Sequence, residues 1–376
     1  MAASVLDYAS DVKKIFFNKG ALPTQLIYYV TNRCNAKCHH CFFWDELNVP
    51  MNELTLDEIR QITKTLDSLS FLIMTGGEPF MRKDIAELAK AFYDNCGVRN
   101  IVIPSNGILK NQTLEAVKKM SGYCPNAHLV VNISFDGLRE QHDYNRGVPC
   151  FDKAWDTLKA LKELKKTHPN LNVGTIITYT AFNQHNIKEV YEFIRDNMQP
   201  DSITMNFVRG KPKNPDTKNV NVENFEGVSR EIEEDLLTGK LEGFNNFPLA
   251  DVSRVTNILI REHVARTVRE NRELMPCLAG TLSGVLYSNG DVFPCELLDR
   301  KIGNIRDFGF DFRKLWETER ARKTRDFIKD TKCFCTHECF YYTNMLMNPL
   351  NLPKVAAKIA KLKVNRALHK LKQGAQ

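Results

Sequence analysis

Short apolar segments rich in β-branched residues alternate with amphipathic stretches along the first half of the chain. Six of these segments have the length and composition of buried strands: residues 26–30, 71–74, 100–103, 129–134, 172–178 and 202–207. Between them, hydrophobic residues recur at helical spacing, as in residues 55–69, 82–94 and 151–165. Strands that alternate with helices predict parallel βα units with right-handed crossovers. In such a fold the chemistry is expected in loops at the C-terminal ends of the strands.

The pattern changes after the sixth strand. Residues 209–221 are rich in Pro, Lys and Asn, which is typical of a surface loop, and helical stretches follow at residues 222–241 and 252–274. A β-hairpin is predicted over residues 285–293, with Asn289 and Gly290 as its turn. With a boundary near residue 245, we expect a lead-in (1–24), an α/β core (25–245), a small C-terminal α+β domain (246–350) and a tail (351–376).

Composition and charge narrow the class of protein. The chain is 43% hydrophobic and 26% charged, as globular proteins are. No apolar run approaches the roughly 18–20 residues of a membrane span, and Asp7 and Asp11 interrupt the region where a signal peptide needs its apolar core. We therefore expect a cytoplasmic protein. Seven of the 52 Lys and Arg residues lie beyond residue 339, where there is no Asp or Glu, so the rest of the chain is neutral. This neutrality argues against a nucleic-acid partner.

Three of the eleven cysteines follow the first predicted strand directly. Cys34, Cys38 and Cys41 form a Cys-x3-Cys-x2-Cys loop, which can hold three corners of a cubane iron–sulfur cluster and leave one iron open. An open iron suits catalysis, whereas a structural zinc site is closed. The alternative for this loop is a zinc ion that takes His39 or His40 as its fourth ligand.

A glycine-rich turn follows the second predicted strand, in the sequence Gly76-Gly77-Glu78-Pro79. Paired glycines let the backbone approach a ligand closely, and the Glu78 carboxylate can receive an amine. On its own, a Gly-Gly-Glu-Pro sequence more often forms a simple turn than a binding site. Its position about 35 residues after a three-cysteine loop favours its being part of a binding site.

Together these two motifs resemble the radical S-adenosylmethionine (SAM) superfamily. The resemblance continues through Ser105-Asn106-Gly107 after the third strand and Ser134-Phe135-Asp136-Gly137 after the fourth, and on to Arg146-Gly147, and it covers roughly residues 25–210. One departure is His40, where many members carry an aromatic residue. The resemblance implies a partial (β/α)6 TIM-like barrel, in agreement with the six predicted strands.

The resemblance also implies cofactors and roles for residues. Cys34, Cys38 and Cys41 would bind a [4Fe–4S] cluster whose fourth iron chelates SAM. Reductive cleavage of SAM would then give a 5′-deoxyadenosyl radical, which takes a hydrogen atom from the substrate. The cofactor-binding residues implied are Gly76, Gly77, Glu78 and Pro79 at the methionine end, Ser105 and Asn106, Ser134 at the ribose, and Asp136 and Arg146. For Ser105 and Asn106 a plain turn is an equal alternative, and we interpret His142 as a helix-surface histidine.

Five further cysteines lie in the C-terminal domain: Cys277, Cys295, Cys333, Cys335 and Cys339. Two distant thiols that flank a hairpin, together with a later cluster of three, can enclose one cubane. The Cys277-x12-Gly290-x4-Cys295 segment resembles the SPASM or Twitch extension of radical SAM enzymes, which carries auxiliary [4Fe–4S] clusters. A full SPASM set has seven cysteines, so we expect one auxiliary cluster and one spare thiol among Cys333, Cys335 and Cys339. A zinc knuckle is the alternative. Cys96, Cys124 and Cys150 are interpreted as ordinary thiols.

The resemblance predicts a radical SAM enzyme that oxidises its substrate, with flavodoxin or ferredoxin as the type of reductant. The alternative is redox-neutral or additive chemistry, in which the auxiliary cluster only anchors or orients the substrate. By this resemblance, the first candidate reaction is the modification of a ribosomally made peptide. The second is the modification or dehydrogenation of a small molecule or lipid. A zinc-stapled binding protein is the non-enzymatic alternative. The lysine-rich tail, residues 353–372, predicts either a solvated terminal helix or weak contact with an anionic membrane surface.

Overall fold

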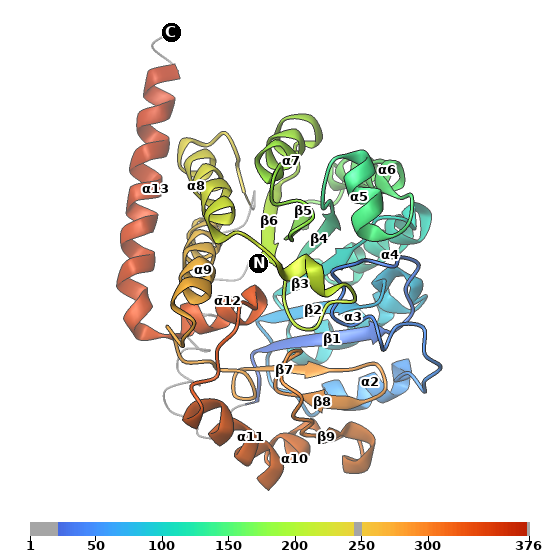
Figure 1. Cartoon of the computed structure of the whole chain (residues 1–376). Helices are drawn as coiled ribbons and strands as arrows, with labels where there is room; N and C mark the ends of the chain where they lie inside the picture. Colours follow the sequence, from blue (N-terminus) through green and yellow to red (C-terminus); the bar gives the residue numbers. More distant parts are fainter. Residues whose placement is uncertain (1–21, 244–249, 374–376) are drawn as a thin grey trace.

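A computed structural model describes residues 22–243 and 250–373. Its centre is one curved sheet with the strand order β6-β5-β4-β3-β2-β1-β7-β8-β9 (Figure 1). The strands are β1 (Gln25–Thr31), β2 (Phe71–Gly76), β3 (Asn100–Ser105), β4 (His128–Ser134), β5 (Leu171–Tyr179), β6 (Ser202–Phe207), β7 (Ser283–Leu286), β8 (Asp291–Phe293) and β9 (Gly303–Asn304). The first six are those expected from the hydrophobic pattern. They pair in parallel and in chain order, which confirms the α/β barrel-like fold.

Helices cover the outer face of the barrel strands and the open edge of the sheet. Those between the strands are α2 (Leu56–Thr63), α3 (Ile85–Cys96), α4 (Lys110–Tyr123), α5 (Arg139–Arg146), α6 (Phe151–Lys165) and α7 (Ile187–Phe193). After the sixth strand come α8 (Val222–Thr238), α9 (Ala250–Glu270), α10 (Phe312–Trp316), α11 (Glu319–Asp330), α12 (Glu338–Met347) and α13 (Leu352–Gln373). The expected helix over 55–69 ends early at residue 63. No helix among these described residues is long and apolar enough to cross a membrane.

The C-terminal part of the chain is joined to the barrel through the sheet itself. Its first strand, β7, pairs in parallel with β1, so that Gln25 faces Ser283. The predicted hairpin forms with β8, and Gly290 takes the left-handed conformation, φ +91°, that the turn requires. The expected domain boundary near residue 245 lies outside the described residues, as does most of the expected lead-in.

The two faces of the barrel strands differ in packing. Outward side chains such as Leu72, Ile101, Leu129 and Val173 are fully buried beneath the helices. On the inward face, Ile73, Val102 and other side chains are only half-buried, although they belong to central strands. In a complete TIM barrel the inward side chains fill the interior. Here the barrel is partial and its interior is hollow.

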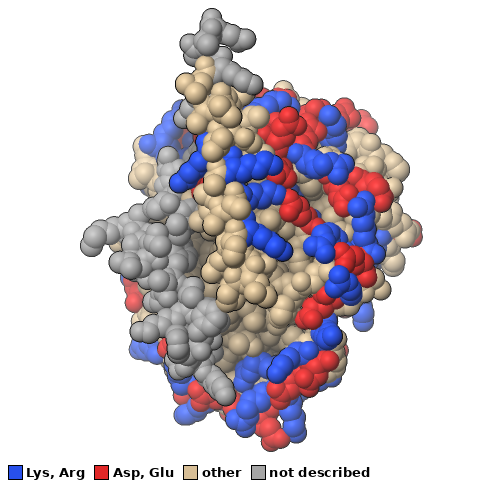
Figure 2. Space-filling view, turned by 90° about the vertical axis from the view of Figure 1, so that its left-hand side faces the viewer, with Lys and Arg blue, Asp and Glu red and all other residues tan. Residues whose placement is uncertain are grey.

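The tail forms one long helix, α13, that packs along α8 and α9 (Figure 1). Val355 and Leu362 on its first half are buried against Leu237 and Val255. The prediction of a solvated helix is therefore wrong for this face, because its apolar residues share one side and cover the two neighbouring helices. Figure 2 shows the opposite side of α13, a tan column flanked by Lys and Arg side chains.

Candidate active site

The sequence motifs meet in one cavity of about 230 Å³ at the C-terminal ends of the strands. One wall is the loop of Cys34, Cys38 and Cys41, which follows β1. The turn after β2 forms the floor with Gly76, Gly77 and Glu78. The last residues of β3, β4 and α5 add Ser105, Ser134 and Arg146, and Asn106 follows β3 directly. Residues from 34 to 146 converge here because the carboxyl ends of parallel strands meet at one edge of the sheet.

The three-cysteine loop is held from two sides by backbone hydrogen bonds. The Lys37 and His39 amides donate to the carbonyls of Arg146 and Asn145 at 2.9 and 3.0 Å, which fixes the loop on the end of α5. On the other side, the Asn48 side chain bridges the backbone N–H and C=O of Cys34. Burial raises the pKa of the Cys34 thiol to about 11 and that of Cys41 to about 12. Three half-buried thiols on a preformed loop fit a metal cluster, which binds thiolates by displacing their protons.

Gly76 and Gly77 are required by the close approach of this turn to the cluster loop. A Cβ at Gly76 would lie 2.2 Å from the Thr31 carbonyl oxygen, and one at Gly77 2.1 Å from that of Arg33. Gly76 also has φ +124°, a conformation that side chains disfavour. The amide of Gly77 donates to the Thr31 carbonyl at 2.9 Å. The two motifs are therefore one structural unit.

Glu78 is a buried carboxylate at the centre of a hydrogen-bond network. Its oxygens accept from the Ser105 hydroxyl at 2.9 Å, the Asn106 amide at 2.8 Å and the Phe80 amide at 3.2 Å. Burial raises the pKa of Glu78, and these three donors limit the rise. Ser105 and Asn106 line the cavity, but their hydrogen bonds hold Glu78, so they are more than a plain turn. Pro79 lies outside the cavity lining, because it opens the 3-10 turn that Glu78 caps.

Asp136 departs from its predicted contact with the cofactor. Its side chain is fully buried and lies outside the cavity lining, because Oδ1 accepts the Thr178 amide at 2.7 Å and Oδ2 pairs with Arg146 at 2.6 Å. Burial by itself would raise the pKa of Asp136, but the charges of Arg146 and His40 outweigh burial and hold it below its usual value. Arg146 does line the cavity, and its Nη1 lies 3.6 Å from Cys38 Sγ. Asp136 thus orients a cation beside a cluster-loop thiol.

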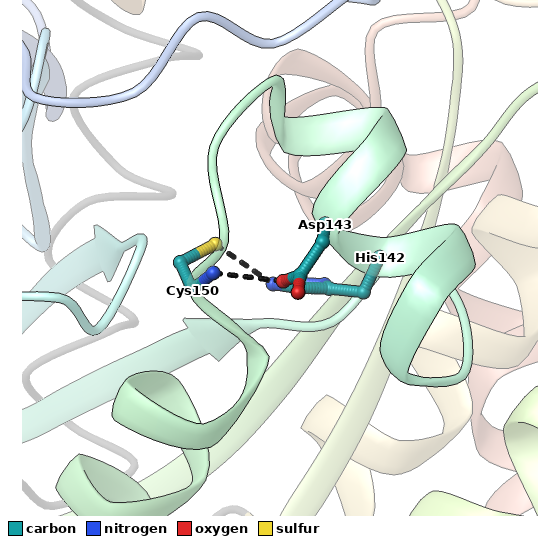
Figure 3. A group of neighbouring side chains, drawn as sticks. All are labelled: His142, Asp143 and Cys150. Carbon is teal, nitrogen blue, oxygen red and sulfur yellow. Dashed lines mark hydrogen bonds between the residues drawn. The ribbon is translucent and has the colours of Figure 1, made fainter.

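Behind this pair, His142, Asp143 and Cys150 bring three metal-ligating side chains together (Figure 3). Asp143 accepts the amides of Cys150 and Phe151 and so caps α6. His142 accepts the Asp136 amide at Nδ1 and places Nε2 3.3 Å from Cys150 Sγ. The interpretation of His142 as a surface histidine is wrong: it is fully buried, and burial lowers its pKa to about 4. The trio is satisfied internally and supports the Asp136 loop.

The opposite wall of the cavity comes from β1, the loop after β6 and the C-terminal part of the chain. Arg209 lies over the Phe42 ring and pairs with Glu338 at 3.0 Å, while its buried Nε has no hydrogen-bond partner in the described structure. Glu296 accepts the Tyr29 hydroxyl and pairs with His337. No spacing in the sequence links residues 29, 209, 296 and 337, so motif analysis could not bring them together.

The C-terminal cysteines separate into two groups. Four of them line a second cavity of about 250 Å³: Cys277, Cys295, Cys333 and Cys335. Cys339 lines the first cavity instead, because α12 begins at Glu338 and carries it toward Arg209 and Glu296. Four thiols at one cavity match the number of corners in a cubane. His337 also lines the second cavity, and through Glu296 it connects the two.

Two family models match the chain at these two sites. The radical SAM superfamily model matches residues 28–196, and the model of the SPASM iron–sulfur cluster-binding domain matches residues 277–340. The chain contains a radical SAM domain and a SPASM domain. A radical SAM domain implies SAM and a [4Fe–4S] cluster, and a SPASM domain implies auxiliary iron–sulfur clusters. The matched ranges include both groups of cysteines described above.

Similar proteins agree with this assignment. The AdoMet-dependent heme synthase of Methanosarcina barkeri is 27% identical over 317 residues, which cover 81% of this chain and 85% of the relative. Among solved structures, anSMEcpe with bound AdoMet and Cp18Cys peptide superposes with TM-score 0.56 at 18% identity, covering 93% of this chain and 98% of that one. Streptococcus suis SuiB bound to precursor peptide SuiA gives TM-score 0.56 at 18% identity, covering 84% and 68%. At this identity the structures show the common fold.

Proposed function

We propose that this radical SAM enzyme abstracts a hydrogen atom from a substrate held between the cluster loop and the SPASM residues, and completes an oxidation. The single observation that carries the proposal is the first cavity, whose walls hold the three cluster-loop thiols on one side and Arg209, Glu296 and Cys339 on the other. When bound, SAM and its [4Fe–4S] cluster supply a hydrogen-abstracting radical.

In this proposal Cys34, Cys38 and Cys41 hold the SAM-binding cluster. Gly76, Gly77 and Glu78 receive the methionine end of SAM, and Ser134 the ribose. Ser105 and Asn106 act by orienting Glu78, since their hydrogen bonds end on its carboxylate. Arg146 acts at the cluster-loop side of the cavity.

On the SPASM side, we assign the auxiliary cluster to Cys277, Cys295, Cys333 and Cys335, and Cys339 is the spare thiol. Glu296 follows Cys295 directly and faces the substrate cavity. After a hydrogen atom is abstracted, a dehydrogenation requires the substrate radical to lose one electron and one proton. The electron would pass to the auxiliary cluster, and the Glu296–His337 pair, whose Glu296 lines the cavity, would accept the proton. The barrel (25–245) and the auxiliary domain (246–350) remain the division that we propose.

We favour a small molecule or lipid as the substrate. This choice is supported by the relative that matches the chain along most of both lengths, which is named as a heme synthase rather than a peptide-modifying enzyme. The peptide substrate that the sequence put first is the second candidate, favoured by solved neighbours whose titles include peptides.

The test is anaerobic reconstitution followed by iron counting and measurement of 5′-deoxyadenosine with a chemical reductant. We expect about eight irons in the wild type and about four in a Cys34→Ala/Cys38→Ala/Cys41→Ala variant, because each cubane holds four. SAM cleavage is expected only in the wild type. Zinc in place of iron would refute the radical chemistry. Activity with reduced flavodoxin or ferredoxin would identify the physiological class of reductant.

The exposed side of α13 is a separate proposal, a weak contact with an anionic membrane surface. Val364, Leu368 and Leu371 are exposed there, and Lys361 and Lys363 lie beside them. Apolar side chains flanked by lysines suit the headgroup region of such a membrane. Co-sedimentation with phosphatidylglycerol vesicles but not with phosphatidylcholine vesicles is the expected result, and a Leu368→Asp variant is expected to lose it.

A further inference from the structure

The hollow interior of the barrel is a cavity of its own, about 190 Å³ in volume. We call it the lumen. Inward side chains of β2 to β6 line it, and α9 and α12 close its open side with Ser253, Asn257, Ile260, Glu338 and Tyr342. Its volume is well above what one water molecule needs. The strands and helices that line the lumen are themselves packed into the core, so the lumen is a feature of the fold.

Most of the surface that the lumen exposes is apolar, although polar side chains such as Asn172, in register with Val130, also line it. In the strand register, Ile73 lies beside Val102 and Val102 beside Val130, and these three half-buried side chains form one layer of the lumen wall. Ile260 of α9 lies on the same cavity. Apolar side chains left uncovered inside a protein forfeit burial free energy, and water in such a layer finds few polar partners. This layer is therefore shaped for an apolar ligand.

The lumen is continuous with the candidate active site. Ile73, Pro104, Ile176, Asn206 and Cys339 line both cavities. At the junction the buried Oδ1 of Asn206 has no hydrogen-bond partner in the described structure, and neither has the Arg209 Nε just beyond it. A ligand that enters the lumen from the active site would meet this acceptor and this donor with a polar group.

We propose that the lumen holds a linear hydrocarbon chain of the substrate, an acyl or prenyl chain, whose polar end lies at Asn206 and Arg209. A hydrocarbon chain needs no hydrogen bonds along its length. A peptide chain would carry N–H and C=O groups past Ile73, Val102 and Val130, which offer them no partner, and only the polar side chains elsewhere on the wall could pair with some of them. The proposal rests on the proposed function for one point, that the reacting carbon lies in the SAM cavity.

The depth of the lumen sets the length of the chain. Its inward positions on β4 run from His128 to Asn132, which is about 13 Å at the usual rise of a strand. An extended chain advances about 1.2 Å per bond. A chain on the order of ten carbons therefore spans the lumen.

The test is anaerobic isothermal titration calorimetry of straight-chain carboxylates, from six to fourteen carbons, into the reconstituted full-length protein with SAM. We expect Kd to fall about three- to four-fold with each added methylene, and to level off near ten carbons. The heat capacity change should be negative, the mark of buried apolar surface. Two variants move the limit in opposite directions: Val130→Trp fills the lumen and shortens the longest chain that fits, and Phe71→Ala, at the deep end of the lumen on the level of His128, lengthens it.

Iron content and 5′-deoxyadenosine formation without substrate, measured on the same samples, report on the proposed function separately. No dependence of Kd on chain length would overturn the lumen proposal even if both of these are normal. The same holds if Phe71→Ala leaves the chain-length limit unchanged, which remains measurable should Val130→Trp fail to fold. Binding of an apolar peptide that Val130→Trp abolishes, with no binding of carboxylates, would assign the lumen to a peptide instead.

Discussion

Replacement of Asp136 by Asn is expected to destabilise the protein strongly, although it changes one atom. The Asp136 carboxylate is fully buried and pairs with Arg146, whose side chain is 9% exposed, at 2.6 Å. The Asn side chain can still accept the Thr178 amide, so the main loss is the negative charge. Loss of this charge leaves the buried Arg146 guanidinium without its carboxylate partner, which lowers the free energy of unfolding by about 3–5 kcal/mol. The unfolding entropy is about 2.1 cal/mol/K per residue, so the melting temperature of this 376-residue chain should fall by about 4–6 °C.

The measurement is thermal unfolding of reconstituted samples with matched iron content, followed by circular dichroism. The matched control is Asp152→Asn, which breaks the ion pair between Asp152 and Arg139. These two side chains are 66% and 55% exposed, respectively. Solvent screens that pair, so the control should cost less than about 1 kcal/mol. The double variant Asp136→Asn/Arg146→Met should recover much of the loss, since no buried charge remains. Equal shifts for Asp136→Asn and Asp152→Asn would refute the reasoning.

Three further predictions concern the turn, the buried histidine and the auxiliary cluster. Gly77→Ala places a Cβ 2.1 Å from a backbone oxygen of the cluster loop, so about four irons should be lost. Burial holds the pKa of His142 at about 4 in the folded protein. In the unfolded chain the histidine takes up its proton already as the pH falls below 6.5. Protonation therefore favours the unfolded chain, and the free energy of unfolding should fall by about 2 kcal/mol by pH 5. In His142→Gln this loss is absent, so the gap in urea midpoint between the variant and the wild type should narrow at pH 5. Cys295→Ala should lose about four irons, and Cys339→Ala none.

Each of these has a comparison that separates it from general damage. Gly122→Ala, a helical position with no atom within 4 Å of the added Cβ, should keep all its iron and gain about 0.5–1 kcal/mol of stability. A gap for His142→Gln that is the same at pH 7 and pH 5 would show that the histidine is charged in the fold. Loss of iron in Cys339→Ala would make that thiol a ligand after all.

Much of this protein was readable from its sequence because the decisive residues are close together along the chain. The alternation of strands and helices predicted the barrel, since both periodicities arise from local backbone geometry. Cys34, Cys38 and Cys41 stand on one loop, and the glycine pair directly follows a strand, so these short motifs carried the resemblance that implied the cofactors. The nine-residue β5 and the hairpin at Gly290 were also placed correctly to within a few residues.

What the sequence could not decide is how distant side chains meet. Asp136 was expected at the cofactor and instead lies behind Arg146, a choice made by the Thr178 amide of a neighbouring strand. Which of the five C-terminal cysteines lies apart from the second cavity depended on where α12 begins. The hollow lumen depended on how far the strands curve before α9 closes them. The sequence by itself determined the elements and the cofactor class through short-range pattern. Only tertiary structure decided the second wall of the active site and the lumen, because both arise from contacts between segments far apart in the chain.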